Sequence, residues 1–100
     1  MITDRRPRIE DFEGLLGKFV AVYPDNNEEP VSWKLDQLVK LTTPPLPQMQ
    51  GLDCFILIFL IDDPFDQGLF IFEAGQERFQ LMATPTMPEQ GKNGMQVVIN

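Results

Sequence analysis

The stretch "CFILIFLIDDPFDQGLFIFEAG", residues 54–75, decides the fold of this chain, because two unbroken apolar runs flank an acidic turn. A run that is apolar at every position predicts a strand buried on both faces. Between the runs, Pro64 presets its own φ and Gly68 can take a positive φ, which predicts a hairpin loop. In a chain of 100 residues, the second apolar face of this hairpin must be buried against another part of the chain or against another molecule.

Six strand-like segments with short links and no helix between them predict an antiparallel meander. The segments are 18–23, 32–41, 54–62, 69–73, 78–84 and 95–100. Because free strand edges invite aggregation, we expect the sheet to close as a small barrel or sandwich. The alternation of residue types predicts which side chains face the core. In the second and fifth segments these are Trp33, Leu35, Val39, Leu41, Phe79, Leu81 and Ala83.

One short helix is predicted within residues 8–19. Its apolar residues recur at spacings of three and four and form one stripe, made of Phe12, Leu15, Leu16 and Phe19. Gly17 suits the left-handed position just past a helix end. A helix of about two turns is unstable alone, so we expect it to pack across one end of the sheet.

The composition is that of one acidic domain. The chain has 100 residues, 43% of them hydrophobic, and 8 Lys and Arg against 15 Asp and Glu, a formal charge of −7. We expect a flexible arm at residues 1–8, which carry three arginines, and a single β domain at residues 9–100. The acidic balance disfavours binding to nucleic acid or to an anionic membrane. A single cysteine and the lack of a signal-peptide pattern favour a cytoplasmic location.

Few residues suggest chemistry. The chain has no histidine, which removes the commonest general base and metal ligand. Cys54 opens a strand and is expected to be a buried thiol. Asp62, Asp63 and Asp66 do not have the spacing of a calcium loop. We therefore expect no catalytic residue, no cofactor and no metal.

Two weaker readings stay open. Residues 43–48, "TPPLPQ", are either a rigid connector or a polyproline ligand for an aromatic groove. An enzyme that uses carboxylates alone would need Glu73 with Glu77, or Asp62 with Asp66, at positions predicted to be turns.

Four segments carry a resemblance to a known family: "EDFEGLLGKFVAV", "FILIF", "QGLFIFE" and the terminal "VVIN". Together they resemble a group of short bacterial proteins classed only as a domain of unknown function. The matching positions are Phe12, Leu15, Gly17, Phe55, Leu57, Phe59, Gln67, Gly68, Phe70, Glu73, Pro85 and Asn100. Phe70 stands where the family more often has Tyr, and Phe19 falls one position early. The resemblance covers nearly the whole chain and implies a small β domain with no established activity.

The pattern favours a non-enzymatic domain that acts in protein–protein interaction or assembly. We expect self-association through the hairpin 54–73, into a homo-oligomer or a larger assembly, without nucleic acid or membrane. The expected contact residues are Ile56, Ile58, Leu60, Phe70 and Phe72. The alternative is a small barrel that carries a hydrophobic ligand, which ranks lower because a barrel usually needs about eight strands to enclose a ligand.

Overall fold

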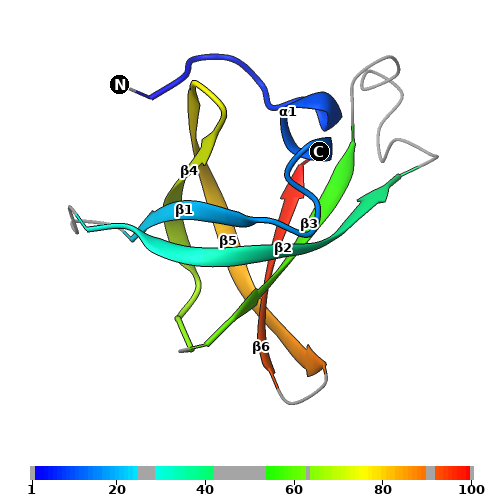
Figure 1. Ribbon diagram of the computed structural model, residues 1–100, viewed down its shortest axis with the longest axis vertical. Coiled ribbons are helices and arrows are strands. Elements are labelled where there is room, and N and C mark those ends of the chain that lie inside the picture. The colour runs from blue at the N-terminus through cyan, green and yellow to red at the C-terminus, as the bar shows by residue number, and fades with distance from the viewer. Residues whose placement is uncertain (1, 25–28, 42–53, 63, 90–91, 100) are drawn as a thin grey trace.

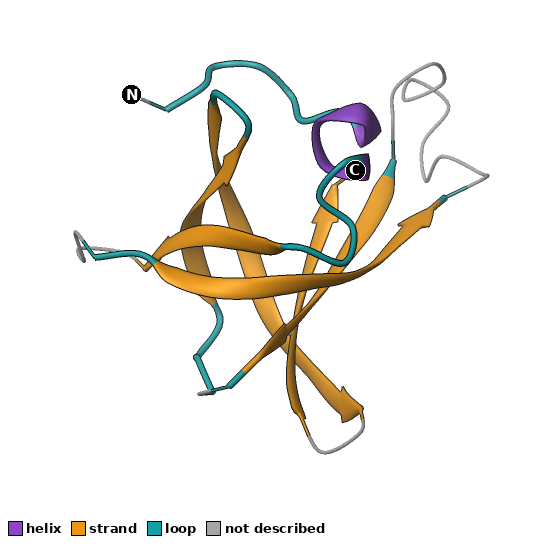
Figure 2. Cartoon of the chain, viewed as in Figure 1, coloured by secondary structure: helices purple, strands orange, loops and turns teal. Residues whose placement is uncertain are grey.

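The chain folds into a closed barrel of six antiparallel strands with one short helix at an end (Figures 1 and 2). The computed structural model describes residues 2–24, 29–41, 54–62, 64–89 and 92–99. Its elements are α1 (Ile9–Glu13), β1 (Phe19–Pro24), β2 (Val31–Lys40), β3 (Phe55–Ile61), β4 (Gly68–Ala74), β5 (Glu77–Glu89) and β6 (Lys92–Ile99). The predicted fold class, a six-stranded antiparallel barrel with an N-terminal helix, is confirmed.

The order of strands around the barrel is β1-β2-β3-β6-β5-β4, and β4 closes on β1. This order differs from a simple meander, because β3 pairs with β2 and β6 whereas β4 pairs with β1 and β5. The prediction that residues 54–73 form a hairpin is therefore wrong. The two apolar runs lie on opposite sides of the barrel, and the β3–β4 link crosses one of its ends (Figure 1). Gly68 begins β4, and among the described glycines those with positive φ are Gly17 and Gly75.

The interior of the barrel is filled by large side chains that alternate inward along every strand. Trp33, Phe79 and Ala83 are buried, and Leu81 packs against the core, as their alternation predicts. The buried set on the strands is Val20, Val22, Trp33, Leu35, Phe55, Leu57, Phe59, Ile61, Phe70, Phe72, Ala74, Phe79, Ala83, Met95, Val97 and Ile99. Because aromatic rings occupy so much of this set, the interior is a packed core.

A β-bulge in β2 reverses the face of the residues that follow it. The register between β2 and β3 shifts between Leu35 and Gln37. A bulge adds one residue to one strand, so the alternation changes phase beyond it. Leu38 consequently packs against the core, and Val39 is exposed on the outer surface. The prediction that Val39 faces inward is wrong for this reason.

The last two strands are longer than their sequence predicts. The sequence predicts a loop at residues 85–94, but residues 85–89 extend β5 and residues 92–94 extend β6, with Pro85 opposite Met95 and Thr86 opposite Gly94. The pairing of β5 with β4 ends at Ala83, so Pro85 has a strand partner on one side only. Proline is tolerated at such an edge because its missing N–H donor is not needed there.

Helix α1 covers one end of the barrel, as expected. Phe12 is 0% exposed, and its ring lies 6.3 Å from that of Phe55 and 5.9 Å from that of Phe79. Leu16 and Phe19, however, are 50% and 68% exposed, so the predicted stripe of four residues is wrong. The helix ends at Glu13, and the chain reverses at Gly17, which has φ +82°.

Described residues of the N-terminal segment make hydrogen bonds and an ion pair with the rest of the domain, whereas the sequence predicts a flexible arm at residues 1–8. The Thr3 backbone N–H donates to the carbonyl oxygen of Arg78 at 2.7 Å, and the Arg78 N–H donates to Thr3 Oγ1 at 3.0 Å. Arg5 makes a two-pronged ion pair with Asp11 at 2.8 and 2.9 Å, and its guanidinium lies over the ring of Phe79. The segment therefore belongs to the packed domain.

Candidate functional site

The outer surface of β1, β2, β3 and β6 carries three rows of side chains, set by the pairing of the strands. One row joins Val39, Ile56 and Val98, and the next joins Gln37, Ile58 and Gln96. The third joins Phe19, Lys34 and Leu60. We name these nine residues the β3 face, since Ile56, Ile58 and Leu60 run along its centre. Three of the five predicted contact residues are thus brought together in one column.

The edges of the β3 face are more exposed than its centre. Phe19 is 68% exposed, and Val39 and Val98 are exposed as well, while Ile56, Ile58 and Leu60 are half-buried between their neighbours. The described elements that contact β3 extensively are its sheet partners, β2 and β6. Exposed apolar side chains that stand singly are ordinary, but a contiguous set is typical of an interaction surface.

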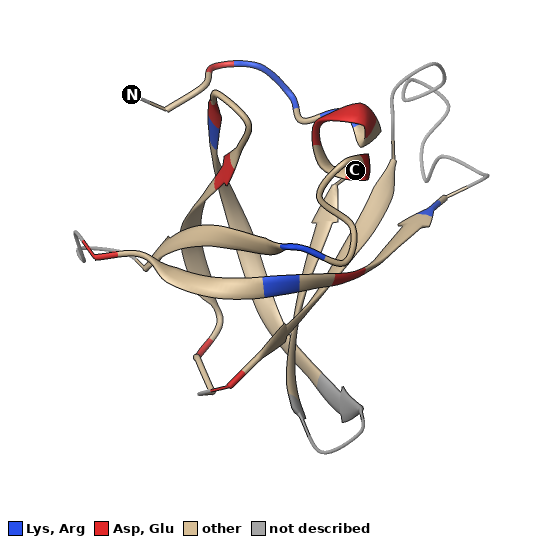
Figure 3. Cartoon of the chain, in the orientation of Figure 1, with Lys and Arg blue, Asp and Glu red and all other residues tan. Residues whose placement is uncertain are grey.

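None of the nine residues of the β3 face is Asp or Glu, but the carboxylate of Asp36 borders it, because Asp36 precedes Gln37 in β2 and its Oδ2 accepts a hydrogen bond from Gln37 Nε2 at 3.4 Å. The one charged residue of the β3 face is Lys34, which lies between Phe19 and Leu60. Figure 3 shows no acidic or basic position in β3, while β2 beside it carries both kinds. Two molecules of net charge −7 that approach through this face would therefore bring few carboxylates together, with Asp36 at its border.

The expectation that Phe70 and Phe72 lie on the outer surface is wrong. They are 5% and 0% exposed, in the barrel interior. The outward apolar residues of β4 are Leu69 and Ile71, and Leu69 lies opposite the exposed Met82 of β5. Because β3 and β4 lie on opposite sides of the barrel, these residues form a second, smaller surface, separate from the β3 face.

A polar cluster on β1, β4 and β5 holds Glu73 in its charged form. Tyr23 Oη and Arg78 Nη2 each donate to Glu73 Oε1 at 2.8 Å. These two hydrogen bonds, with that from Tyr23 the larger, lower the pKa of Glu73. Glu77 accepts a hydrogen bond from Thr3 Oγ1. A carboxylate kept charged in this way is a poor general acid, which counts against the reading of Glu73 and Glu77 as a catalytic pair.

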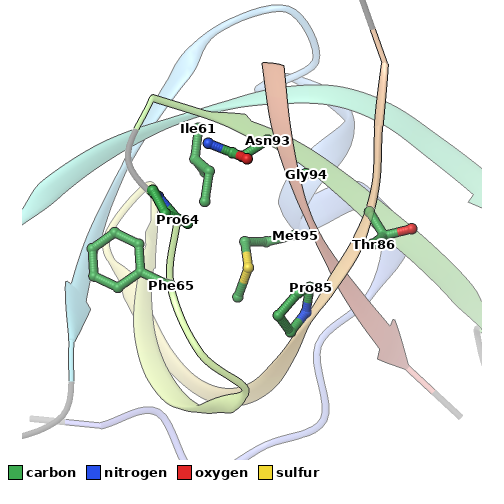
Figure 4. A pocket seen from close by; sticks show the side chains of 8 residues that line it. All are labelled: Ile61, Pro64, Phe65, Pro85, Thr86, Asn93, Gly94 and Met95. Carbon is green, nitrogen blue, oxygen red and sulfur yellow. The ribbon is translucent and has the colours of Figure 1, made fainter. Parts of the chain in front are cut away.

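Two hollows flank the β3–β4 link at the end of the barrel opposite α1. One of about 60 Å³ lies between the link and the β5–β6 pair, with Pro64 and Phe65 on one side and Pro85 and Met95 on the other (Figure 4). The second, of about 270 Å³, lies at the start of β2. Its lining residues are Val31, Ser32, Trp33, Ile61, Asp62 and Phe65.

Cys54 is a buried free thiol, as expected. Arg6 Nη2 lies 3.8 Å from Cys54 Sγ, a contact between residues 48 positions apart that no sequence pattern indicated.

Residues 43–48 and Asp63 lie outside the described residues. Within the described ranges, no group of three or more Cys, Asp or Glu is placed to hold a metal ion. No helix there has the length and apolarity that a bilayer crossing requires.

Comparison of the chain with protein-family models, with curated proteins and with solved structures found no match. The family resemblance drawn from the four sequence segments therefore stays a prediction, and functional argument rests on the side chains themselves.

Proposed function

We propose that this protein is a non-enzymatic β-barrel domain that self-associates through the β3 face. The observation that carries the proposal is the contiguous set of apolar side chains around Ile56, Ile58 and Leu60 on an otherwise acidic chain. The partner that fits best is a second copy, because eight of the nine residues of the face are uncharged and the same surface on both copies can pair about a two-fold axis.

The chemistry of the rows suits contact between copies. Sheet faces pack about 10 Å apart when their outward side chains interdigitate, which the aliphatic row of Val39, Ile56 and Val98 permits. Gln37 and Gln96 flank Ile58, and each amide can both donate and accept hydrogen bonds across a two-fold axis. Lys34 at the edge would remain in contact with water.

The size of the face sets the expected strength of association. Three rows about 7 Å apart on strands about 4.8 Å apart cover an area on the order of 300 Å². That area is at the lower end of the largest apolar patches on monomers, roughly 300–600 Å², which are often functional. It is smaller than the roughly 800 Å² per partner of a standard stable interface, so we expect a weak dimer or a contact repeated within a larger assembly.

Sedimentation equilibrium over about 10 µM to 1 mM tests the proposal, a range chosen for affinities expected of a small interface. The wild type should associate reversibly, and Ile58→Lys, which places a charge in the centre of the face, should be a folded monomer. Leu69→Lys is the matched control, because Leu69 is an exposed aliphatic residue on the opposite side of the barrel. This control should associate like the wild type.

A wild type that stays monomeric throughout this range would count against self-association. Equal dissociation of Ile58→Lys and Leu69→Lys would show that any association does not use the β3 face. Cytoplasmic location and bacterial origin are further predictions, for which cell fractionation and genome context are the measurements.

A further inference from the structure

Strand β2 extends beyond its pairing with β3. On the β1 side, β2 is paired over residues 31–34, with Val31 opposite Val22 at the start. On the β3 side, the pairing ends at Lys34 and Leu60, and the start of β2 diverges from the end of β3 (Figure 1). Among the described residues, positions 31–33 of β2 therefore have a strand neighbour on one edge only.

The backbone of Ser32 points toward this unpaired edge. The N–H of Leu35 donates to the carbonyl oxygen of Lys18 at 2.9 Å, and the carbonyl oxygen of Leu35 accepts from the N–H of Gly17 at 2.7 Å, so both groups of Leu35 face β1. Because successive residues of a strand direct these groups to alternate edges, those of Lys34 and Ser32 face the other edge. Lys34 pairs there with β3. No described residue pairs with the N–H and C=O of Ser32, which is exposed.

Two hollows meet at Ser32. The hollow of about 270 Å³ has the inward residue Trp33 in its lining, and an outer hollow of about 140 Å³ is lined by Phe19 and Leu60 of the β3 face. Ser32 and Asp62 line both hollows. Side chains of a strand alternate between its two faces. A strand lying beside Ser32 would therefore direct successive side chains into the two hollows in turn.

The charge around this edge favours a basic peptide over an acidic one. The carboxylate of Asp62 is exposed and takes part in none of the ion pairs among the described residues. Lys34 lines only the outer hollow, and the whole chain has a net charge of −7. A peptide cation is therefore attracted to the molecule as a whole and can pair with Asp62.

We propose that the edge of β2 at Ser32 binds a short extended peptide with a basic residue between two apolar residues. The basic residue exchanges both backbone hydrogen bonds with Ser32, and its side chain lies on the outer surface near Asp62, because residues directly opposite in a sheet share a face. An adjacent apolar side chain points the other way, into the hollow of about 270 Å³. Addition of a strand to a sheet edge, with pockets for alternate side chains, is a general mode of peptide recognition. This binding does not depend on self-association through the β3 face.

The test uses the peptide acetyl-Leu-Lys-Leu-amide and an analogue that carries a methyl group on the backbone nitrogen of its lysine. The two probes have the same charge and side chains, but only the first can donate from this nitrogen to the carbonyl oxygen of Ser32. In a ¹H–¹⁵N titration, the unmethylated peptide should move the Ser32 amide resonance downfield with saturation, at a dissociation constant on the order of 1–10 mM. The analogue should bind roughly 2- to 12-fold more weakly, the effect of one lost hydrogen bond.

Two variants separate the backbone of Ser32 from its side chain. Ser32→Ala keeps the N–H and should bind the unmethylated peptide as the wild type does. Ser32→Pro removes the N–H and should weaken binding by a similar factor of roughly 2 to 12. Proline is tolerated at an edge position whose N–H has no partner in the sheet. Equal affinities of the two variants, or weaker binding by Ser32→Ala, would overturn the proposal.

Other results have equally direct meanings. A Ser32 resonance that the peptide does not move, or equal affinities for the two probes, would overturn the proposal. In Ile58→Lys, which lacks the apolar centre of the β3 face, a Ser32 resonance that shifts as the protein alone is concentrated would assign this edge to a second copy instead. If Ser32→Pro does not fold, the comparison of the two probes on the wild type still decides the question.

Discussion

Phe12 should be among the residues whose truncation most destabilises the fold. Its side chain is 0% exposed and closes one end of the barrel between Phe55 and Phe79. Replacement of a fully buried phenylalanine by alanine lowers the free energy of unfolding by about 3–5 kcal/mol, since it removes apolar contacts and leaves a cavity. A domain of this size has a total stability of about 5–15 kcal/mol, so Phe12→Ala should remove a large part of it.

Urea denaturation followed by the fluorescence of Trp33 measures this change. At an m value of about 1–3 kcal/mol/M, the midpoint for Phe12→Ala should fall by at least about 1 M. The matched control is Leu16→Ala, four residues later in the same segment, where the side chain is 50% exposed. A surface substitution of this kind should change the stability by no more than about 0.5 kcal/mol. Similar losses in the two variants would refute the reasoning, because the sequence stripe alone treats Phe12 and Leu16 as equivalent.

Two further predictions concern the N-terminal segment and the turn after the helix. The hydrogen bonds from Arg5 and from the backbone of Arg8 lower the pKa of Asp11. The contribution of Asp11 to stability is therefore present above the unfolded pKa of about 3.9 and is lost as the pH falls through the lower folded pKa. In Arg5→Ala, a carboxyl NMR titration should give a higher Asp11 pKa, and an unchanged pKa would contradict the assignment. In the same urea assay, Gly17→Ala should destabilise the protein by about 1 kcal/mol, because φ is +82° at residue 17. Gly14→Ala is the control: φ is −71° at residue 14 and the surroundings are equally open, so this change should be neutral or slightly stabilising.

Part of the fold was predictable because it depends on local alternation. Trp33, Leu35, Phe79 and Ala83 are buried as their period of two predicts. That period reports which residues share a face of a strand. It needs no knowledge of the neighbouring strands as long as one series is polar and the other is apolar.

The candidate site was only partly predictable. Ile56, Ile58 and Leu60 lie on the outer surface as expected, but Phe70 and Phe72 belong to the interior. Both alternating series of β4 are apolar, so the sequence contains no signal that distinguishes its two faces.

Six short strands, a helix too short to stand alone, an acidic composition and the lack of histidine are all readable from the residues alone. The pairing of β3 with β6 instead of β4, and the bulge before Gln37 that turns Val39 outward, become evident only when the strands are assembled. The physical reason is that strand pairing and register minimise the free energy of contacts between residues far apart in the chain. Alternation within one strand constrains its two faces but does not specify which other strand will cover them.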